Sequence, residues 1–139
     1  MEAITPSSKI YLGKSFIPNA GRGVFALFDL KEGEVIESCP VIEVPKKDLP
    51  LLRQTLFVNY YFLWGKHMET VAICLGFGSL YNHSYEPNAT YIKHVEEEMI
   101  NFIALKDIKK GEEITVNYNH GNPYDKSPLW MKDVPPPED

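Results

Sequence analysis

Proline and glycine interrupt this chain so often that few helices or strands have room to grow long. The sequence has 139 residues with 11 Pro and 9 Gly, which recur every eight to twelve residues over much of its length. The segments between these breaks are rich in β-branched and aromatic residues, which pack well on a pleated sheet. The pattern predicts a mainly β fold with little helix. Strands are expected at Lys9 to Leu12, Gly23 to Ala26, Val35 to Ser38, Val41 to Val44, Val71 to Leu75, Thr90 to Val95, Met99 to Leu105 and Ile114 to Tyr118.

One segment has the spacing of a helix. In Leu49 to Val58, Leu49, Leu52 and Leu56 fall on one helical face, and Asp48 is suited to cap the first turn. A helix this short needs tertiary contacts to be stable. The sequence therefore predicts one short helix that packs against the sheets.

An internal echo links two distant parts of the chain. The segment Ala26 to Ile36 matches Ala104 to Ile114 at seven positions, and both contain a Lys-x-Gly-Glu turn. Glycine supplies the positive φ that such a turn requires, and aspartate supplies a local side-chain hydrogen bond. We expect two similarly built strand-turn-strand units that pack as pseudo-equivalent halves.

The charge balance excludes one functional class. There are 14 Lys and Arg against 19 Asp and Glu, a formal net charge of −5 with His neutral, so a polybasic nucleic-acid binder is excluded. No apolar run approaches the roughly 18 residues that span a bilayer, and the first residues lack a signal-peptide pattern. Cys39 and Cys74 have no CxxC or paired-histidine context, so neither a metal site nor a disulfide framework is expected. A soluble intracellular protein without a membrane partner follows.

Three motifs carry the functional signal. They are the segment Gly21 to Phe25, the polar segment Asn82 to Asn88 and the segment Gly111 to Tyr118. Taken alone, the polar segment permits a hydrolase in which His83 activates Ser84. Adjacent residues rarely aim at each other as base and nucleophile, and no glycine-flanked elbow surrounds Ser84, so we rank a hydrolase lowest.

In this order and spacing, the three motifs resemble the SET domain of protein lysine methyltransferases. The resemblance covers roughly Lys9 to Trp130. The chain is similar to the minimal stand-alone SET proteins of prokaryotes and viruses. It implies small curved sheets with a knot-like C-terminal threading, which is an exception to the usual rules of chain connection. The expected organisation is a single SET domain over residues 1–139, with a core at about 9–130 and a flexible Pro-rich tail at 131–139.

The resemblance also implies a cofactor, S-adenosylmethionine, and no metal. Carried onto this chain, Ala20, Gly21 and Arg22 would offer backbone groups to it. Asn82 and His83 would bind its amino-acid and adenine portions. A further cofactor-binding residue, Trp130, resembles the C-terminal aromatic that packs on adenine in members without a zinc-binding tail.

Two tyrosines are implied to act on the substrate lysine. Tyr118 aligns with the active-site tyrosine that positions the amine, and Tyr60 aligns with a tyrosine of the lysine channel. Aromatic walls attract an ammonium group by cation–π interaction, and desolvation lowers the pKa of a lysine from about 10.4. The neighbouring Tyr61 is interpreted as a packing residue.

Three positions depart from the family pattern. Tyr85 replaces a frequent cysteine, Asn117 replaces an aspartate, and Val116 stands where many members carry Phe or Tyr. Neither of the first two changes removes a group that the chemistry needs. The smaller Val116 is hypothesised to leave room for more than one methyl group.

The sequence therefore predicts a lysine methyltransferase that acts on a lysine-bearing protein or peptide. The alternative is a catalytically idle SET-like module that binds peptides or other partners. A homodimer is an expectation from the minimal members alone. The expected location is cytoplasmic for a prokaryotic protein and nuclear for a eukaryotic or viral one.

Overall fold

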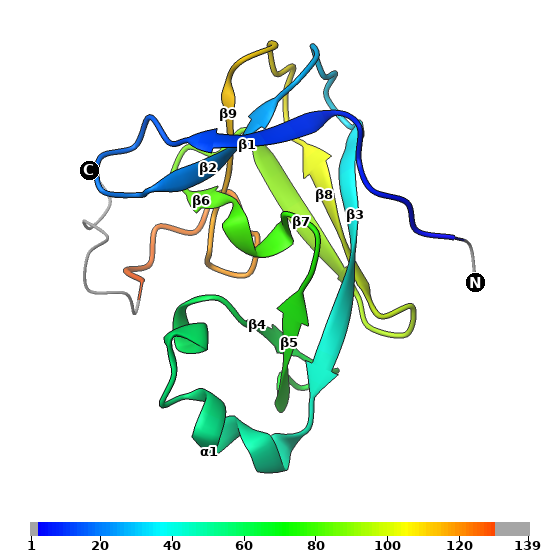
Figure 1. Cartoon of the computed structure of the whole chain (residues 1–139), viewed down its shortest axis with the longest axis vertical. Helices are drawn as coiled ribbons and strands as arrows, with labels where there is room; N and C mark the ends of the chain where they lie inside the picture. Colours follow the sequence, from blue (N-terminus) through cyan, green and yellow to red (C-terminus); the bar gives the residue numbers. More distant parts are fainter. Residues whose placement is uncertain (1–2, 130–139) are drawn as a thin grey trace.

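The computed structural model describes residues 3–129 and contains two curved sheets (Figure 1). In the four-stranded sheet the order is β1 (Ile10–Lys14), β2 (Arg22–Ala26), β9 (Glu113–Val116) and β6 (Asn82–His83). In the five-stranded sheet it is β4 (Phe62–Trp64), β5 (Thr70–Cys74), β3 (Val35–Val44), β8 (Met99–Ala104) and β7 (Ala89–His94). The predicted mainly β fold is confirmed, while the knot-like threading stays a prediction.

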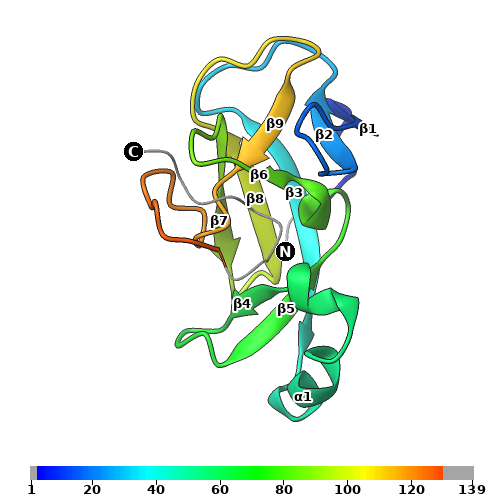
Figure 2. The ribbon, with the colours of Figure 1, turned by 90° about the vertical axis from the view of Figure 1, so that its left-hand side faces the viewer.

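The five-stranded sheet curls until its two edge strands meet. The rings of Phe62 on β4 and Tyr91 on β7 pack edge to face with centroids 5.2 Å apart, and Lys93 Nζ donates to the Leu63 carbonyl at 2.7 Å. Figure 2 shows β4 below the end of β7. This closure brings β4 and the segment before it close to β7, the strand at the other edge of the sheet.

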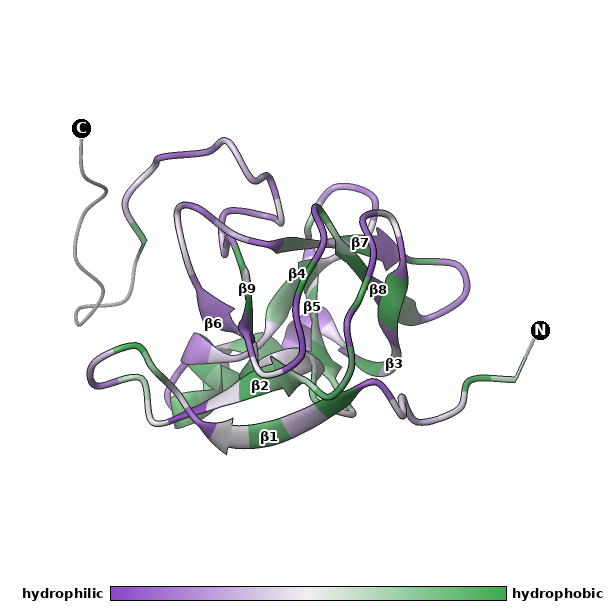
Figure 3. Ribbon diagram, turned by 90° about the horizontal axis from the view of Figure 1, so that it is seen from above, coloured by the Kyte–Doolittle hydropathy of each residue, from purple (hydrophilic) through white to green (hydrophobic). Residues whose placement is uncertain are grey.

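The hydrophobic core lies between the two sheets. Val24 and Ile114 of the first sheet and Ile36, Ile100 and Phe102 of the second are all at most 1% exposed. Side chains alternate along the strands, as a half-buried sheet requires. Figure 3 shows the loop between β7 and β8 as hydrophilic, and its glutamates, at positions 96–98, are exposed in the way expected of a solvated hairpin turn.

The echoed segments form two reciprocal turns, which we call the first turn unit (Ala26–Ile36) and the second turn unit (Ala104–Ile114). Leu30 and Ile108 exchange backbone hydrogen bonds of 2.7 and 2.8 Å. The amide of the turn glycine in each unit donates to the first carbonyl of the other unit, Gly33 to Ala104 and Gly111 to Ala26, both at 2.8 Å.

The side chains of the two units repeat this reciprocity. Asp107 Oδ1 accepts from the Glu32 amide at 2.9 Å, and Asp29 Oδ1 accepts from the Lys110 amide at 2.8 Å. Glu32 corresponds to Lys110 in the echo, and Asp107 corresponds to Asp29, so the two hydrogen bonds are reciprocal. The predicted pairing of similarly built halves is confirmed by these hydrogen bonds.

The predicted helix Leu49 to Val58 is wrong in extent. The chain forms a 3-10 turn η1 (Lys46–Asp48), a one-turn helix α1 (Leu49–Leu52) and a second 3-10 turn η2 (Leu56–Asn59). Thr55 explains the break, because its hydroxyl donates to the Leu52 carbonyl at 2.7 Å and accepts from the Phe57 amide at 3.2 Å. Such side-chain bonds to the backbone compete with helix formation.

Two further expectations change with the tertiary contacts. Asp48 makes no side-chain capping bond, and none of the residues of α1 is buried. The two strands expected on either side of Pro40 are one continuous strand, β3, because the Pro40 carbonyl still accepts from the Leu75 amide at 3.0 Å. Within residues 3–129 no helix is long and apolar enough to cross a membrane.

Candidate functional site

The site begins where the second turn unit leads into β9. Strand β9 pairs in parallel with β6, so that Asn82 lies opposite Thr115 and His83 opposite Val116. Figure 2 shows β6 beside β9 at one end of the four-stranded sheet. The fold thus brings together two of the three sequence motifs, and β2, the other neighbour of β9, brings the third.

A polar cluster of Ser15, Arg22, Asn82 and Glu113 joins these strands. Asn82 Nδ2 donates at 2.9 Å to both the Arg22 carbonyl and Glu113 Oε2. Glu113 also accepts from Ser15 Oγ at 2.8 Å and from the Phe16 amide at 2.9 Å, which ties the β1–β2 loop to β9. Asn82 therefore bonds the main chain of Arg22 directly, and the Glu113 carboxyl group holds the Asn82 amide in place.

Sequence reasoning missed the part played by Glu113 and Ser15. Glu113 falls within the third motif, so its position was marked, but the contact with Asn82 depends on the pairing of β9 with β2 and β6. A second signal was Gly23, where an added Cβ would lie 2.4 Å from Glu113 Oε2. Only glycine leaves room for that carboxyl group.

The loop that carries Ala20 and Gly21 presents open backbone next to this cluster. Gly21 has a φ of 74°, and an added Cβ would meet nothing within 4 Å. Its carbonyl accepts from the Ser15 amide at 2.8 Å, which fixes the loop. This loop leads into Arg22, whose carbonyl bonds Asn82, and the role of Ala20, Gly21 and Arg22 in binding a cofactor stays a prediction.

His83 has one satisfied and one open ring nitrogen. Nδ1 accepts from the Tyr118 amide at 3.0 Å, so the ring proton of the neutral imidazole sits on Nε2. Nε2 is buried and has no hydrogen-bond partner among the described residues. Burial lowers the pKa of His83 to about 4, which keeps the ring neutral. An unpartnered buried N–H suits a ligand that brings an acceptor.

Tyr118 follows directly from the end of β9, two residues after Val116. Its hydroxyl donates to the Tyr81 carbonyl at 2.5 Å. Burial, with smaller contributions from Tyr60 and Glu113, raises the pKa of the phenol, so the group stays protonated. A protonated hydroxyl that donates to a carbonyl leaves its oxygen lone pairs free to accept from another group.

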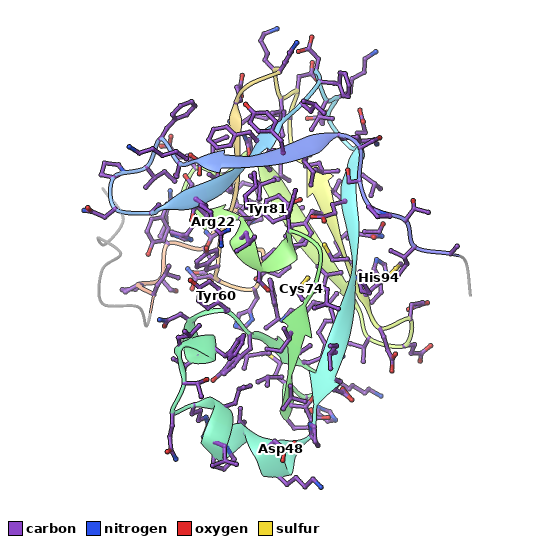
Figure 4. All side chains as sticks on the ribbon, in the orientation of Figure 1. Arg22, Asp48, Tyr60, Cys74, Tyr81 and His94 are labelled. Atoms are coloured by element: carbon purple, nitrogen blue, oxygen red, sulfur yellow. The ribbon has the colours of Figure 1, made fainter. Side chains whose placement is uncertain are left out.

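Tyr118 also lines an aromatic cavity of about 310 Å³. Its lining includes Tyr60, Tyr61, Tyr91 and Val116 and contains no Asp or Glu. Tyr60 is 43% exposed and comes from the end of η2, and Figure 4 shows it below Arg22 and Tyr81. Tyr61, interpreted from the sequence as a packing residue, also lines this cavity.

Two departures from the family pattern hold the C-terminal segment. The Tyr85 hydroxyl donates to the Ser127 carbonyl at 2.9 Å, and Asn117 Nδ2 donates to the Asp125 carbonyl at 2.7 Å. Asn119 Nδ2 adds a bond of 2.8 Å to the same Ser127 carbonyl. Side-chain amides and a phenol therefore anchor the chain up to Ser127. The predicted cofactor residue Trp130 lies outside the described residues.

In the part of the chain that the structure describes, no group of three or more His, Cys, Asp or Glu side chains is arranged to hold a metal ion. Both cysteines are buried and free. Hydrogen bonding from Cys74 and burial raise the pKa of the Cys39 thiol, which keeps it in the unreactive thiol form.

Comparison with known proteins identifies the family. The profile of the SET domain matches residues 21–119. A Schizosaccharomyces pombe histone-lysine N-methyltransferase, specific for histone H3 lysine 37, is 32% identical over 114 residues, which are 81% of this chain and 71% of that protein. The chain belongs to the SET-domain family, and the predicted enzyme class, protein-lysine N-methyltransferase, is confirmed at that level.

Solved structures agree with this assignment. A crystal structure of a candidate histone methyltransferase from Plasmodium falciparum is 33% identical, covers 84% of this chain and 96% of that one, and has a TM-score of 0.67. A chain of the Polycomb Repressive Complex 2 of Chaetomium thermophilum, in a structure bound to S-adenosylmethionine, is 26% identical with a TM-score of 0.69. The match covers 84% of the present chain and 16% of the Polycomb chain. All of these relatives are eukaryotic, so they do not support the prokaryotic and cytoplasmic branch of the sequence analysis.

Proposed function

We propose that this chain transfers methyl groups from S-adenosylmethionine to the ε-amine of a lysine in a protein substrate. The observation that carries the proposal is the position of Tyr118 between two different environments. Its backbone amide donates to His83, the residue that follows Asn82, while Tyr118 also lines the aromatic cavity. A methyl transfer needs such a meeting point, because donor and acceptor must approach from opposite sides.

The polar cluster is proposed as the cofactor side. Ala20, Gly21 and Arg22 are proposed to contact the cofactor, and the open space beside Gly21 and the unpartnered N–H of His83 suit a ligand rich in hydrogen-bond acceptors. Asn82 is held in place by Glu113, so its side chain is preorganised. Trp130 is proposed to cover the adenine, and the bonds that anchor Ser127 three residues earlier support that role.

The aromatic cavity is proposed as the lysine channel, with Tyr60 at its wall. Aromatic faces attract ammonium and methylammonium groups by cation–π interaction, and the absence of acidic residues from the lining favours loss of the lysine proton on desolvation. S-adenosylmethionine supplies an electrophilic methyl group, whose bond to sulfur breaks as its bond to the neutral amine nitrogen forms. The Tyr118 hydroxyl is proposed to align the amine for this displacement.

The substrate is proposed to be a protein with a lysine in an accessible segment. Because the relatives are histone methyltransferases, a histone H3 peptide is the first substrate to assay, and a nuclear location is proposed for this chain. Pairing of two copies stays a prediction. The competing idle peptide-binding module is disfavoured because such a module has no need of the combined Asn82, His83 and Tyr118 arrangement.

Calorimetric titration with S-adenosylmethionine tests the cofactor side. Wild-type protein is expected to bind, and Asn82→Ala is expected to lose binding because both its contacts, to Glu113 and to the Arg22 carbonyl, disappear. Asn101→Ala is the matched control, since that part-buried amide bonds Ser38 and His94 far from the site along the sheet. A folded wild type that does not bind the cofactor favours the idle module.

Val116 tests the degree of methylation. Val116 is buried, lines the aromatic cavity and pairs with His83 across β6 and β9. Wild type is expected to add more than one methyl group, and Val116→Phe is expected to stop at one because the ring occupies that space. Mass spectrometry of the peptide product distinguishes these states. A strictly monomethylated product from the wild type contradicts the hypothesis.

A further inference from the structure

Glu37 is an acidic side chain in the core that none of the sequence motifs includes. It is 6% exposed and stands on β3, where the pairing with β8 shifts by one residue between Val35 and Glu37. This β-bulge leaves Ile36 and Glu37, consecutive residues, both buried. Bulges re-aim side chains and are frequent beside active sites.

The two carboxyl oxygens of Glu37 have separate partners. Oε1 accepts from the Tyr81 hydroxyl at 2.8 Å, and Oε2 accepts from the Phe77 amide at 2.9 Å. The 3-10 turn η3 (Gly78–Leu80) lies between these two donors, so Glu37 holds the chain at both its ends. Among the described residues the one salt bridge joins Lys9 to Glu34, and Glu37 is therefore held by hydrogen bonds.

The surroundings are shaped to keep the Glu37 carboxyl group in place. An added Cβ at Gly76, which has a φ of 63°, would lie 2.5 Å from Oε2. Phe102, which pairs with Glu37 across β3 and β8, stacks on the ring of Tyr81 with centroids 4.2 Å apart. The same strand pair thus fixes Tyr81 twice, through its ring and through its hydroxyl.

Tyr81 connects this arrangement to the site. Its main-chain carbonyl accepts the hydrogen bond from the Tyr118 hydroxyl, and the next residue is Asn82. A rotation of the Tyr81 backbone would therefore move the acceptor of Tyr118. A core of this kind favours apolar side chains, so burial of an acid is costly unless its hydrogen bonds compensate.

We propose that Glu37 is a positioning residue for methyl transfer, which acts by fixing Tyr81 and hence the carbonyl that orients the Tyr118 hydroxyl. The proposal rests on the proposed function. It places a contribution to catalysis on β3, in the five-stranded sheet, whereas the polar cluster lies on the four-stranded sheet. The hydrogen bonds of Glu37 reach neither the polar cluster nor Tyr118, so its effect is expected on the rate of turnover.

Two variants test the role. Tyr81→Phe removes only the hydroxyl and keeps the ring on Phe102, and Glu37→Gln keeps the size of the side chain but faces one donor with an amide group. Each is expected to lower kcat about tenfold, which corresponds to one hydrogen bond of about 1.4 kcal/mol, with the peptide KM within about twofold. The double variant is expected to be no slower than the slower single variant, because both act through one contact.

Controls separate positioning from stability. Tyr11→Phe makes the same chemical change on β1, where Tyr11 stacks on Phe25, and is expected to keep kcat within about twofold of wild type. The calorimetric stoichiometry for S-adenosylmethionine counts folded sites, so it is expected to stay at the wild-type value. NMR of isotope-labelled tyrosine is expected to show a shifted Tyr118 ring signal in Tyr81→Phe and Glu37→Gln but not in Tyr11→Phe.

The outcomes are distinguishable. A wild type that methylates, together with variants that lower only the melting temperature and leave kcat and the Tyr118 signal unchanged, overturns the positioning role alone. A wild type that neither binds S-adenosylmethionine nor methylates overturns the proposed function and the role of Glu37 with it. If Glu37→Gln does not fold, Tyr81→Phe decides the question by itself.

Discussion

The two turn units have nearly the same backbone contacts but lead to strands with different tasks. From the first unit the chain enters β3, which lies inside the five-stranded sheet between β5 and β8. From the second unit it enters β9, which has four residues and ends at the site. At equivalent places after the turn glycines stand Glu37, which is buried in the core, and Thr115, which pairs with Asn82.

The difference shows what a local sequence specifies and what it does not. The shared Lys-x-Gly-Glu pattern determines the turn, because glycine reaches a φ of 83° or 88° at low cost. The partners of the following strand determine its function. Strand β3 has long neighbours on both sides and becomes core, whereas β9 has the two-residue β6 on one side and leaves its end open to ligands.

The largest effect is expected from a substitution just beyond the end of β9, which leaves the first turn unit and β3 unchanged. Tyr118→Phe removes the hydroxyl that donates to the Tyr81 carbonyl but keeps the amide that donates to His83. We expect turnover of a peptide substrate to fall at least about a hundredfold, as when a group that stabilises a transition state is lost. Calorimetric affinity for S-adenosylmethionine is expected to stay near wild type. Loss of cofactor binding in a folded variant would show that Tyr118 belongs to the cofactor side.

The comparison of the halves also shows how far sequence reasoning reaches. The motifs predicted Asn82, His83 and Tyr118 as site residues, because these residues lie in segments whose order and spacing are specific, and the structure brings the three together. Glu37 and Tyr81 could not be paired in advance, since they are 44 residues apart and meet only through a bulge in β3. Short-range patterns carry no information about such a contact.

Other elements divide in the same way. The strands β7 and β8 and the two turn units were predicted, since their signals are local. The helix expected at Leu49 to Val58 failed because Thr55 diverts the backbone with its own hydrogen bonds. The cavity was expected only through Tyr60, because its walls come from segments that the curled sheet brings together.

A smaller effect is expected on the pH dependence of stability, through His83 on β6, the neighbour of β9. Burial holds the pKa of His83 at about 4, below the value of about 6.5 for an unfolded histidine. The unfolded chain therefore binds more protons between these values, so the stability from this group is complete above about pH 6.5 and is lost as the pH falls toward 4. Denaturant unfolding across this range is expected to show it.

The control is His83→Asn, whose amide oxygen can accept from the Tyr118 amide without titrating. Burial also lowers the pKa of His120, which remains in both proteins, so the difference between them isolates His83. The stability of the variant is expected to depend less on pH between about 6.5 and 4. Identical slopes for variant and wild type would refute the assignment.

The smallest effect compares the two turn glycines directly. Gly33 and Gly111 have φ values of 83° and 88°, and in each case an added Cβ would meet nothing within 4 Å. Alanine therefore adds no clash and costs only the left-handed conformation, about 1 kcal/mol. Gly33→Ala and Gly111→Ala are expected to lower the free energy of unfolding equally, as measured by urea denaturation.

Gly13→Ala is the matched control for this pair. Gly13 lies in β1 outside the left-handed region, and an added Cβ would make ordinary contacts of 3.4 Å with the Phe25 ring, so its loss of stability is expected to be smaller. Equal losses at Gly33 and Gly111 would mean that the two turns are energetically as alike as their hydrogen bonds. A clearly larger loss at Gly111 would mean that the open end of β9 makes the second turn more dependent on its own backbone, and the equivalence of the halves would then hold for geometry alone.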